Sequence, residues 1–355
     1  MEHTSSGYRL GFALRSLVMT SLACVIAAGA ARAAPDAAGY HQVKKIPITG
    51  QATYYDYLFV DEAARRLYVS FGGDVVIFDI DKDQPAGRLT GLQKVHGIAA
   101  GAGRLFVTDG ALDIVRVFDG KTLAKVGEVK AGANPDAVLF DPATKQVFAF
   151  NNHGKSATVF DPGTLAVKAT IELGGAAEFG RSDGKGTVWV NLEDKSEVVR
   201  IDAKKLTATA HWPLAPCQEP TGLALDGKNR RLFAGCNNKL MAVMDADSGK
   251  VITTLPIGPG VDATAFDPAT HDIFNSCGGD EGSLVVVHQD SADAYHVVET
   301  HPTQKRAKTL ALDPRSHRVF LTAGTFAPTP PATAETPKPR APIVPGSFAL
   351  QIWQR

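Results

Sequence analysis

Charged and polar side chains occupy one equivalent position in seven successive repeats of about forty residues. They are Asp56, His96, Asp136, Glu178, Thr221, Asp262 and Lys308. Carboxylates that converge on a narrow space repel one another, which raises some of their pKa values or attracts a cation. Oxygen ligands with an occasional imidazole suit Ca²⁺, Mg²⁺ or Mn²⁺, and histidine with carboxylates also suits Zn²⁺. The pattern therefore indicates a polar ligand site or a metal site, if the fold gathers these positions.

Neighbouring segments add four further polar residues to this candidate ligand-binding set. They are Tyr54, His153, Glu219 and Arg306. We predict His96, Glu178 and Asp262 as metal ligands, and His96 leads because it is the one histidine at this repeat position. The competing interpretation is a hydrated polar lining without an ion, since acidic residues at strand starts also accept backbone hydrogen bonds. For His153, an isolated loop residue, the competing interpretation is a surface histidine.

An apolar triplet with a large central residue recurs seven times and identifies the elements that carry these positions. The triplets begin at Leu67, Leu105, Val147, Val188, Leu232, Ile273 and Val319, at intervals of 38 to 46 residues. Alternating segments that end in Asp, such as residues 75–79, favour strands over helices. A period near forty made of short strands is typical of a β-propeller. We predict an all-β fold of seven blades, each with four antiparallel strands, with the seven polar positions around one mouth of the central channel.

The two ends of the repeat region are predicted to share a blade. Residues 42–49 resemble an outermost strand, whereas the chain stops after a third strand at 348–353, so the N-terminal strand completes the last blade and closes the ring. Residues 325–345 contain seven prolines and interrupt blade seven. We expect a flexible or polyproline II loop that does not pair as a strand, either a solvated insertion or a lid over the mouth. Residues 41–355 then form a single propeller domain.

The N-terminus has the features of an export signal. Residues 1–33 combine Arg9 and Arg15 with an apolar run and an A-x-A cleavage site, and 34–40 form a linker. We therefore expect a periplasmic or secreted protein without a membrane-spanning segment.

Three cysteines follow the predicted cleavage site, and an oxidising compartment favours one disulfide among them. We predict a bond between Cys217 and Cys236, because both lie in loops on one face of one blade. The alternative pairs Cys236 with Cys277, which occupy matching positions in adjacent blades.

The charge balance and the motifs exclude several function classes. The chain has 37 basic and 37 acidic residues, and removal of residues 1–33 leaves 34 and 36. This balance lacks the basic excess typical of nucleic-acid binding. Zinc-type cysteine and histidine spacing, a haem-attachment motif, a P-loop and a dinucleotide fingerprint are absent from the sequence. A small molecule or a protein is the expected partner, and a monomer the expected state.

Segments 134–142 and 220–226 carry a resemblance to a known family. Their apolar strands, Asp-containing turns and the repeat around them resemble the YncE-like, YVTN-repeat seven-bladed propellers of secreted bacterial proteins, over residues 41–353. The resemblance implies a propeller that binds a ligand and transfers no catalytic residue. The first hypothesis is a binding protein for a small ligand, a metal ion or a protein partner. The alternative is a metal-assisted hydrolase or lyase of lactone-type or sugar-like substrates, in which His96, Glu178 and Asp262 are ligands or general acid and base.

Overall fold

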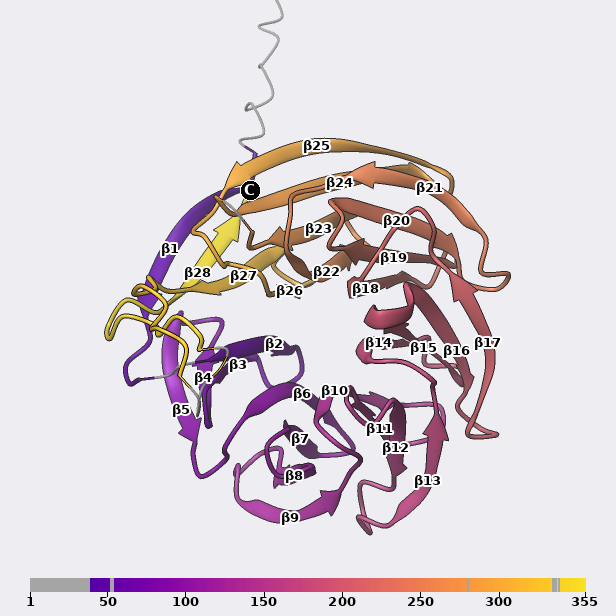
Figure 1. Cartoon of the computed structure of the whole chain (residues 1–355), viewed down its shortest axis with the longest axis horizontal. Coiled ribbons are helices and arrows are strands. Elements are labelled where there is room, and N and C mark those ends of the chain that lie inside the picture. Colours follow the sequence, from indigo (N-terminus) through magenta and orange to yellow (C-terminus); the bar gives the residue numbers. More distant parts are fainter. Residues whose placement is uncertain (1–38, 52–53, 280, 334–336, 338) are drawn as a thin grey trace, which may run out of the picture. The chain divides into compact units, whose positions relative to one another are not determined.

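A computed structural model describes residues 39–51, 54–279, 281–333, 337 and 339–355. The predicted signal peptide and most of the predicted linker lie outside these residues. Seven four-stranded antiparallel sheets surround a central channel (Figure 1), and this confirms the predicted all-β propeller. One 3₁₀ helix, η1 (Glu193–Lys195), lies within blade four. No helix in the described ranges has the length and apolar character needed to cross a membrane.

Each sheet contains four strands in the order inner, second, third and outer. The inner strands are β2 (Tyr55–Asp61), β6 (Val95–Gly101), β10 (Pro135–Asp141), β14 (Ala177–Ser182), β18 (Pro220–Asp226), β22 (Val261–Asp267) and β26 (Leu310–Asp313). The second strands are β3 (Arg66–Phe71), β7 (Arg104–Asp109), β11 (Gln146–Asn151), β15 (Thr187–Leu192), β19 (Arg231–Cys236), β23 (Asp272–Cys277) and β27 (Arg318–Ala323). The third strands are β4 (Asp74–Asp79), β8 (Ile114–Asp119), β12 (Ser156–Phe160), β16 (Glu197–Asp202), β20 (Leu240–Asp245), β24 (Ser283–Ser291) and β28 (Ala349–Gln354). The outer strands are β5 (Gln84–Leu89), β9 (Lys125–Lys130), β13 (Val167–Glu172), β17 (Thr207–Pro213), β21 (Val251–Pro256), β25 (Ala294–Pro302) and β1 (His41–Pro47).

The N-terminal strand is the outer strand of the last sheet. β1 pairs antiparallel with β28, from His41 opposite Gln354 to Pro47 opposite Ala349. The inner strands contact one another in sequence around the channel, and β26 contacts β2. The circle of inner strands is therefore continuous, and each inner strand contacts the inner strands of both neighbouring blades.

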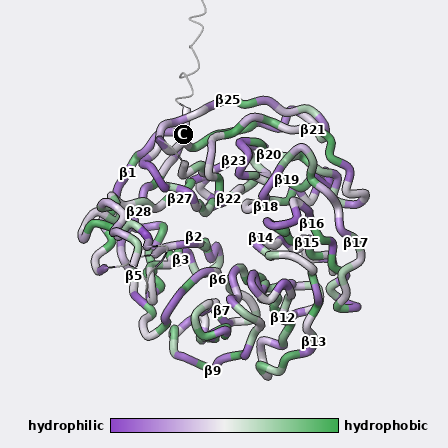
Figure 2. The backbone as a smooth tube through the Cα atoms, in the orientation of Figure 1, coloured by the Kyte–Doolittle hydropathy of each residue, from purple (hydrophilic) through white to green (hydrophobic). Residues whose placement is uncertain are grey.

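All seven apolar triplets lie in second strands, and their central residues are at most 1% exposed. These central residues are Tyr68, Phe106, Phe148, Trp189, Phe233, Phe274 and Phe320. Their clusters join neighbouring blades, as where Tyr68 of β3 packs with Leu105 and Val107 of β7. Figure 2 accordingly shows hydrophobic segments in strands around the whole ring. Full burial of one large apolar side chain contributes roughly 1.5–3 kcal/mol to stability. Because every blade buries such a residue, this stabilisation is distributed over the seven blades.

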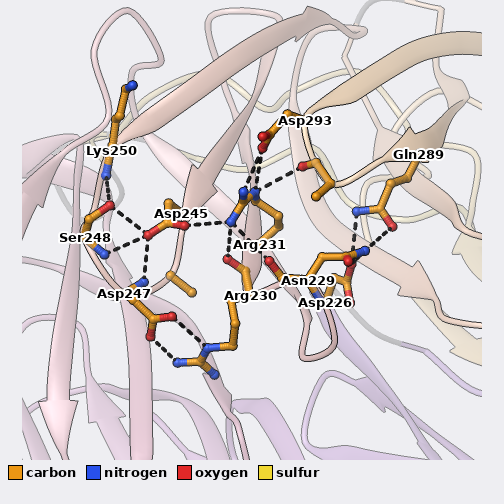
Figure 3. A network of polar contacts seen from close by, with 12 residues as sticks. Asp226, Asn229, Arg230, Arg231, Asp245, Asp247, Ser248, Lys250, Gln289 and Asp293 are labelled. Carbon is orange, nitrogen blue, oxygen red and sulfur yellow. Dashed lines mark hydrogen bonds and ion pairs between the residues drawn. The ribbon is translucent and has the colours of Figure 1, made fainter.

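Polar contacts tie the blades together at the end of the inner strands. Figure 3 shows this between blades five and six, where Arg231 bonds to Asp245 of its own blade at 2.6 Å and to Asp293 of blade six at 2.7 Å. Gln289 of β24 donates to Asp226 at the end of β18, at 3.0 Å. The bonds from Arg231 to Asp293 and from Gln289 to Asp226 therefore link blade five to blade six.

The Pro-rich insertion forms no strand in its described part, but its two arms meet at the base. Phe326 forms an isolated bridge with Ile343, and the amides of Ala327 and Val344 donate to residues of the opposite arm at 2.9 and 2.8 Å. The residues between the prolines can form these bonds because they retain their N–H groups. In blade one the outer strand begins at Gln84, and its Pro85 is tolerated because an outer strand leaves one edge free.

Candidate functional site

The inner strands are irregular where the seven polar positions lie. Six of them have a register shift at their beginning, as between Tyr55 and Leu58 in β2 and between Val95 and Ile98 in β6. A bulge of this kind changes the direction in which the side chain points. In β2, the shift contains Asp56. The repeated bulge explains how similar strands present polar side chains at their start and apolar ones further along.

Small polar residues that follow the triplets hold this irregular backbone. They are Ser70, Thr108, Asn191 and Ser276. The hydroxyl of Ser70 accepts a hydrogen bond from the backbone N–H of Asp56 at 2.6 Å. The hydroxyl of Thr108 donates to the carbonyl of Asp136 in the next blade at 2.7 Å. The sequence-based prediction missed these supporting residues. Their signal was a single hydrogen-bonding residue directly after an apolar triplet.

Asp56, His96 and Asp136 form a compact cluster of buried groups from blades one to three. One potential ligand atom from each residue lies within 4.8 Å of the other two. His96 Nδ1 lies 2.6 Å from Asp56 Oδ2 and 3.4 Å from Asp136 Oδ1. The hydroxyl of Tyr54 donates to Asp56 and lies 2.5 Å from His96 Nδ1. Of the three residues predicted as metal ligands, this cluster includes His96.

Two buried atoms of the cluster lack a hydrogen-bond partner among the described residues. They are His96 Nε2 and Asp136 Oδ1. Nε2 faces the backbone of Gly110, where an added Cβ would lie 2.7 Å away. Nδ1 is therefore the ring nitrogen that faces the carboxylates, and Asp136 Oδ1 is a free acceptor beside it.

Lys308 connects this cluster to Asp262 across the junction of the first and last blades. Its ammonium group forms an ion pair with Asp262 and lies 3.6 Å from Asp56 Oδ1. The side chain of Lys308 is 35% exposed, whereas that of Asp56 is 9% exposed. Asp262, predicted as a metal ligand, therefore lies at the mouth with an ammonium partner.

The pKa values of the mouth residues diverge for physical reasons. Burial raises the pKa of Asp56, but Lys308 and the hydrogen bond from His96 outweigh it and bring this pKa to about 2. Burial raises the pKa of Asp136 to about 7, because the attraction of His96 does not compensate. Burial lowers the pKa of His96, yet the hydrogen bond to Asp56 and the charge of Asp136 raise it overall. One carboxylate is thus firmly ionised while its neighbour retains a proton near neutral pH.

Glu178 lies on the other side of the mouth with partners of its own. Asn152 donates to its Oε1 at 2.7 Å, and the hydroxyl of Tyr57 lies 3.4 Å from Oε2. Burial and the nearby Asp136 raise the pKa of Glu178 well above its ordinary value. Glu178 therefore belongs to the mouth but is outside the Asp56–His96–Asp136 cluster.

The remaining predicted residues have varied roles. Thr221 is buried and donates to the carbonyl of Val261 at 2.6 Å. Arg306 stacks on Phe326 of the Pro-rich insertion, 3.9 Å from the ring centre. His153 and Glu219 are exposed. The fold thus combines most of the predicted set at one mouth but leaves these last two side chains at the surface.

The Pro-rich insertion reaches the site through Tyr54. Arg340 and Lys94 lie 5.7 and 5.6 Å from the centre of the Tyr54 ring. A pocket of about 980 Å³ lies between these residues and the segment 342–345. The insertion therefore contacts the cluster's tyrosine, as the lid interpretation requires.

The disulfide joins Cys217 to Cys236, as predicted, with 5.8 Å between their Cα atoms. Cys277 is free and buried, which excludes the alternative pairing. Burial raises the pKa of the Cys277 thiol to about 12. A thiol with this pKa remains protonated at neutral pH and is a poor nucleophile.

Comparisons with known proteins support the architecture. No family model and no curated protein matches the sequence. Among solved structures, hydrazine synthase of Kuenenia stuttgartiensis is similar, with 14% identity and a TM-score of 0.67. The similarity covers 77% of this chain and 94% of that chain. At this identity it shows the propeller fold alone.

Proposed function

We propose that this protein is a binding propeller whose channel mouth takes a divalent cation at Asp56, His96 and Asp136. The observation that carries the proposal is the convergence of His96 Nδ1 and two buried carboxylates, with Asp136 Oδ1 free of a donor. A cation there replaces the proton that His96 shares with Asp56. It also removes the cost of leaving a buried acceptor unpaired, which is about 1–3 kcal/mol.

The donor set favours Zn²⁺ or Mn²⁺ over Ca²⁺. One imidazole nitrogen and two carboxylates suit transition metals, whereas Ca²⁺ takes 6–8 oxygen ligands in a wider site. The ammonium group of Lys308 opposes binding by its charge, but it neutralises Asp262 and one oxygen of Asp56. Among the described residues Asp136 has no lysine or arginine partner, so once it loses its proton its charge is available to the metal.

Calorimetric titration of metal-stripped protein with Zn²⁺ tests the proposal, with Mn²⁺ and Ca²⁺ in parallel. We expect one Zn²⁺ per chain and at least about a hundredfold weaker binding in His96→Ala or Asp136→Asn, because each removes a ligand atom. His153→Ala is the matched control, since it removes an exposed histidine from the same side of the propeller. Zn²⁺ binding that is unaffected by His96→Ala, or abolished by His153→Ala, would refute this assignment.

Hydrolysis of lactone-type or sugar-like substrates is the second candidate function. It is favoured by Glu178, a carboxyl group at the same mouth but outside the proposed metal ligands, because burial raises its pKa well above the ordinary value, as a general acid requires. Metal-loaded protein should then open a simple γ-lactone, which is followed by titration of the acid released. Asp136→Asn should abolish this turnover. If lactone opening proceeds at the same rate with and without bound Zn²⁺, hydrolysis is refuted and only the binding role remains.

Export and the YncE-like family assignment belong to the same proposal. The Cys217–Cys236 disulfide is compatible with an oxidising compartment, and the seven blades are compatible with that family. Expression of the full chain followed by fractionation and N-terminal sequencing tests export. Mature protein that begins near residue 34 in the periplasm or medium supports it, and full-length protein in the cytoplasm contradicts it.

A further inference from the structure

The central channel contains an apolar cavity beyond the polar mouth. The cavity has a volume of about 620 Å³ and is lined by all seven inner strands. Its lining begins one to three residues after the mouth positions, as at Tyr57, Ala137 and Ala224, and continues to the strand ends. Most lining side chains are apolar, for example Leu139, Leu225 and Phe266. Pockets of this size and character are typical of small-molecule sites.

Two aromatic rings separate this cavity from the mouth. Tyr57 of β2 and Phe179 of β14 have ring centres 4.7 Å apart, although their strands face each other across the central opening (Figure 1). The hydroxyl of Tyr57 points to Glu178 at the mouth, whereas both rings line the cavity. A ligand in the cavity therefore does not reach the Asp56–His96–Asp136 cluster directly.

Arg181 is a cation placed among these apolar side chains. It lines the cavity, lies over Phe179 at 4.7 Å, and donates one hydrogen bond to the carbonyl of Gly180 at 3.1 Å. Within the described part of the chain it has no carboxylate partner. By contrast, Arg65 bonds to Asp81 and Asp313, and carboxylate partners raise its pKa, whereas burial lowers the pKa of Arg181 to about 10.

The strand register shows how unusual this arginine is. Arg181 pairs with Trp189, the central residue of its triplet. The residues that pair with the central residue in the other six blades are all apolar: Phe59, Ala99, Leu139, Ala224, Ala265 and Ala311. Blade four alone among these pairs has a charge at this position. A structural role in the repeat does not require it.

The other charged groups of the cavity leave Arg181 free. Asp226 is satisfied by the side chains of Asn229 and Gln289, and Glu62 and Lys228 lie exposed. A guanidinium group in such a place binds a carboxylate through two parallel hydrogen bonds.

We propose that this cavity binds an organic monocarboxylate with an aliphatic body, and that Arg181 is the residue that holds the carboxylate. One cation matches one negative charge, whereas a phosphate monoester would bring a second, uncompensated charge into an apolar space. The aliphatic body displaces water from the apolar lining, which supplies the remaining affinity. This ligand and the cation of the mouth occupy different compartments.

Calorimetric titration of the purified protein with decanoate tests the proposal. We expect saturable binding of about one decanoate per chain, and about 10- to 100-fold weaker binding of decanol, which lacks the charge. Arg181→Met, which keeps an unbranched apolar side chain but removes the guanidinium group, should weaken decanoate binding by a similar factor and leave decanol binding unchanged. Arg200→Met is the matched control, because Arg200 is also half-buried and lies outside the cavity.

A second variant locates the ligand. Ala265→Phe enlarges a lining residue at the position equivalent to Arg181 and should abolish binding of both decanoate and decanol by filling the cavity. Zn²⁺ titration of Arg181→Met should match the wild type, which separates this site from the mouth. The proposal is overturned if wild-type protein shows no saturable decanoate binding, if decanol binds equally well, or if Arg181→Met binds decanoate as the wild type does.

Discussion

The two ends of the inner strands perform opposite electrostatic tasks with the same backbone. At the mouth, Asp56, His96 and Lys308 compensate one another within 3.6 Å, and the charges are tolerated because each has a partner. In the apolar cavity, Arg181 has no counter-ion among the residues that the structure describes, and burial lowers its pKa. Removal of a charge should therefore be costly at the mouth and nearly neutral in the cavity. The difference also distinguishes the charged groups of the mouth, which already pair with one another, from Arg181, which is available to a ligand.

The largest effect is expected from Asp56→Ala. The substitution leaves Lys308 with Asp262, and His96 with Asp136, as the remaining carboxylate partner, and loss of one member of a buried ion pair typically costs about 3–5 kcal/mol. Urea denaturation should show a correspondingly lower free energy of unfolding. Glu128→Ala is the control, because its pair with Lys125 is half-exposed on both sides and contributes little to stability. Equal effects of the two variants would contradict the partnered description of the mouth.

The next effect concerns pH and cation binding at the mouth. Asp136, with a pKa of about 7, holds a proton below that pH and must lose it to bind a cation. His96, whose pKa is raised, must also be deprotonated at Nδ1. Zn²⁺ affinity should therefore rise by at least about tenfold from pH 6 to pH 8, since each proton displaced below its pKa costs up to a factor of ten per pH unit. Decanoate binding should change little over this range, because Arg181 remains charged and the carboxylate remains ionised.

A third prediction compares two glycines, one at each end of the channel. A Cβ at Gly110 would lie 2.7 Å from the His96 ring and from Asn134, whereas a Cβ at Gly227 meets nothing within 4 Å. Gly110→Ala should therefore cost about 1–3 kcal/mol by overpacking and weaken Zn²⁺ binding. Gly227→Ala, at the rim of the apolar cavity, should change stability by less than about 0.5 kcal/mol. A neutral Gly110→Ala would show that His96 can move without loss.

The smallest effect is expected from Arg181→Met without ligand. The loss of the contact with Phe179, worth roughly 0.5–1 kcal/mol, is offset by removal of an unpaired buried charge. The free energy of unfolding should thus remain within about 1 kcal/mol of the wild type in thermal and urea melts. A loss above about 3 kcal/mol would indicate that Arg181 stabilises the fold and would contradict its availability to a ligand.

The fold was predictable because its signals are local and repeated. The triplets around Tyr68 and Trp189 alternate within five residues, and seven copies of the pattern define the blade count without knowledge of any contact. The Cys217–Cys236 bond also followed from this register, since the repeat places both residues on one face of one blade. The base of the Pro-rich insertion was less predictable, because composition alone did not show that Ala327 and Val344 keep amides free to pair.

The candidate site was predictable only as a set of positions. The repeat placed Asp56, His96 and Asp136 together with Glu178 and Asp262, but it did not show which of them touch. The grouping depends on side-chain reach across bulged strands and on Lys308, which arrives from blade seven to neutralise Asp56 and Asp262. The spacing of these residues in the sequence does not predict which of them are in contact.

The sequence by itself determined the seven blades, their strand order and the residues that stand at the start of each inner strand, because hydrophobic alternation and turn residues act over a few neighbouring positions. The tertiary structure decided which mouth residues share protons and charge, that Tyr57 and Phe179 divide the channel, and that Arg181 remains unpaired in an apolar cavity. Those outcomes arise between residues of different blades, 40 or more positions apart in the chain, where the assembled ring sets the distances that govern electrostatic and packing energies.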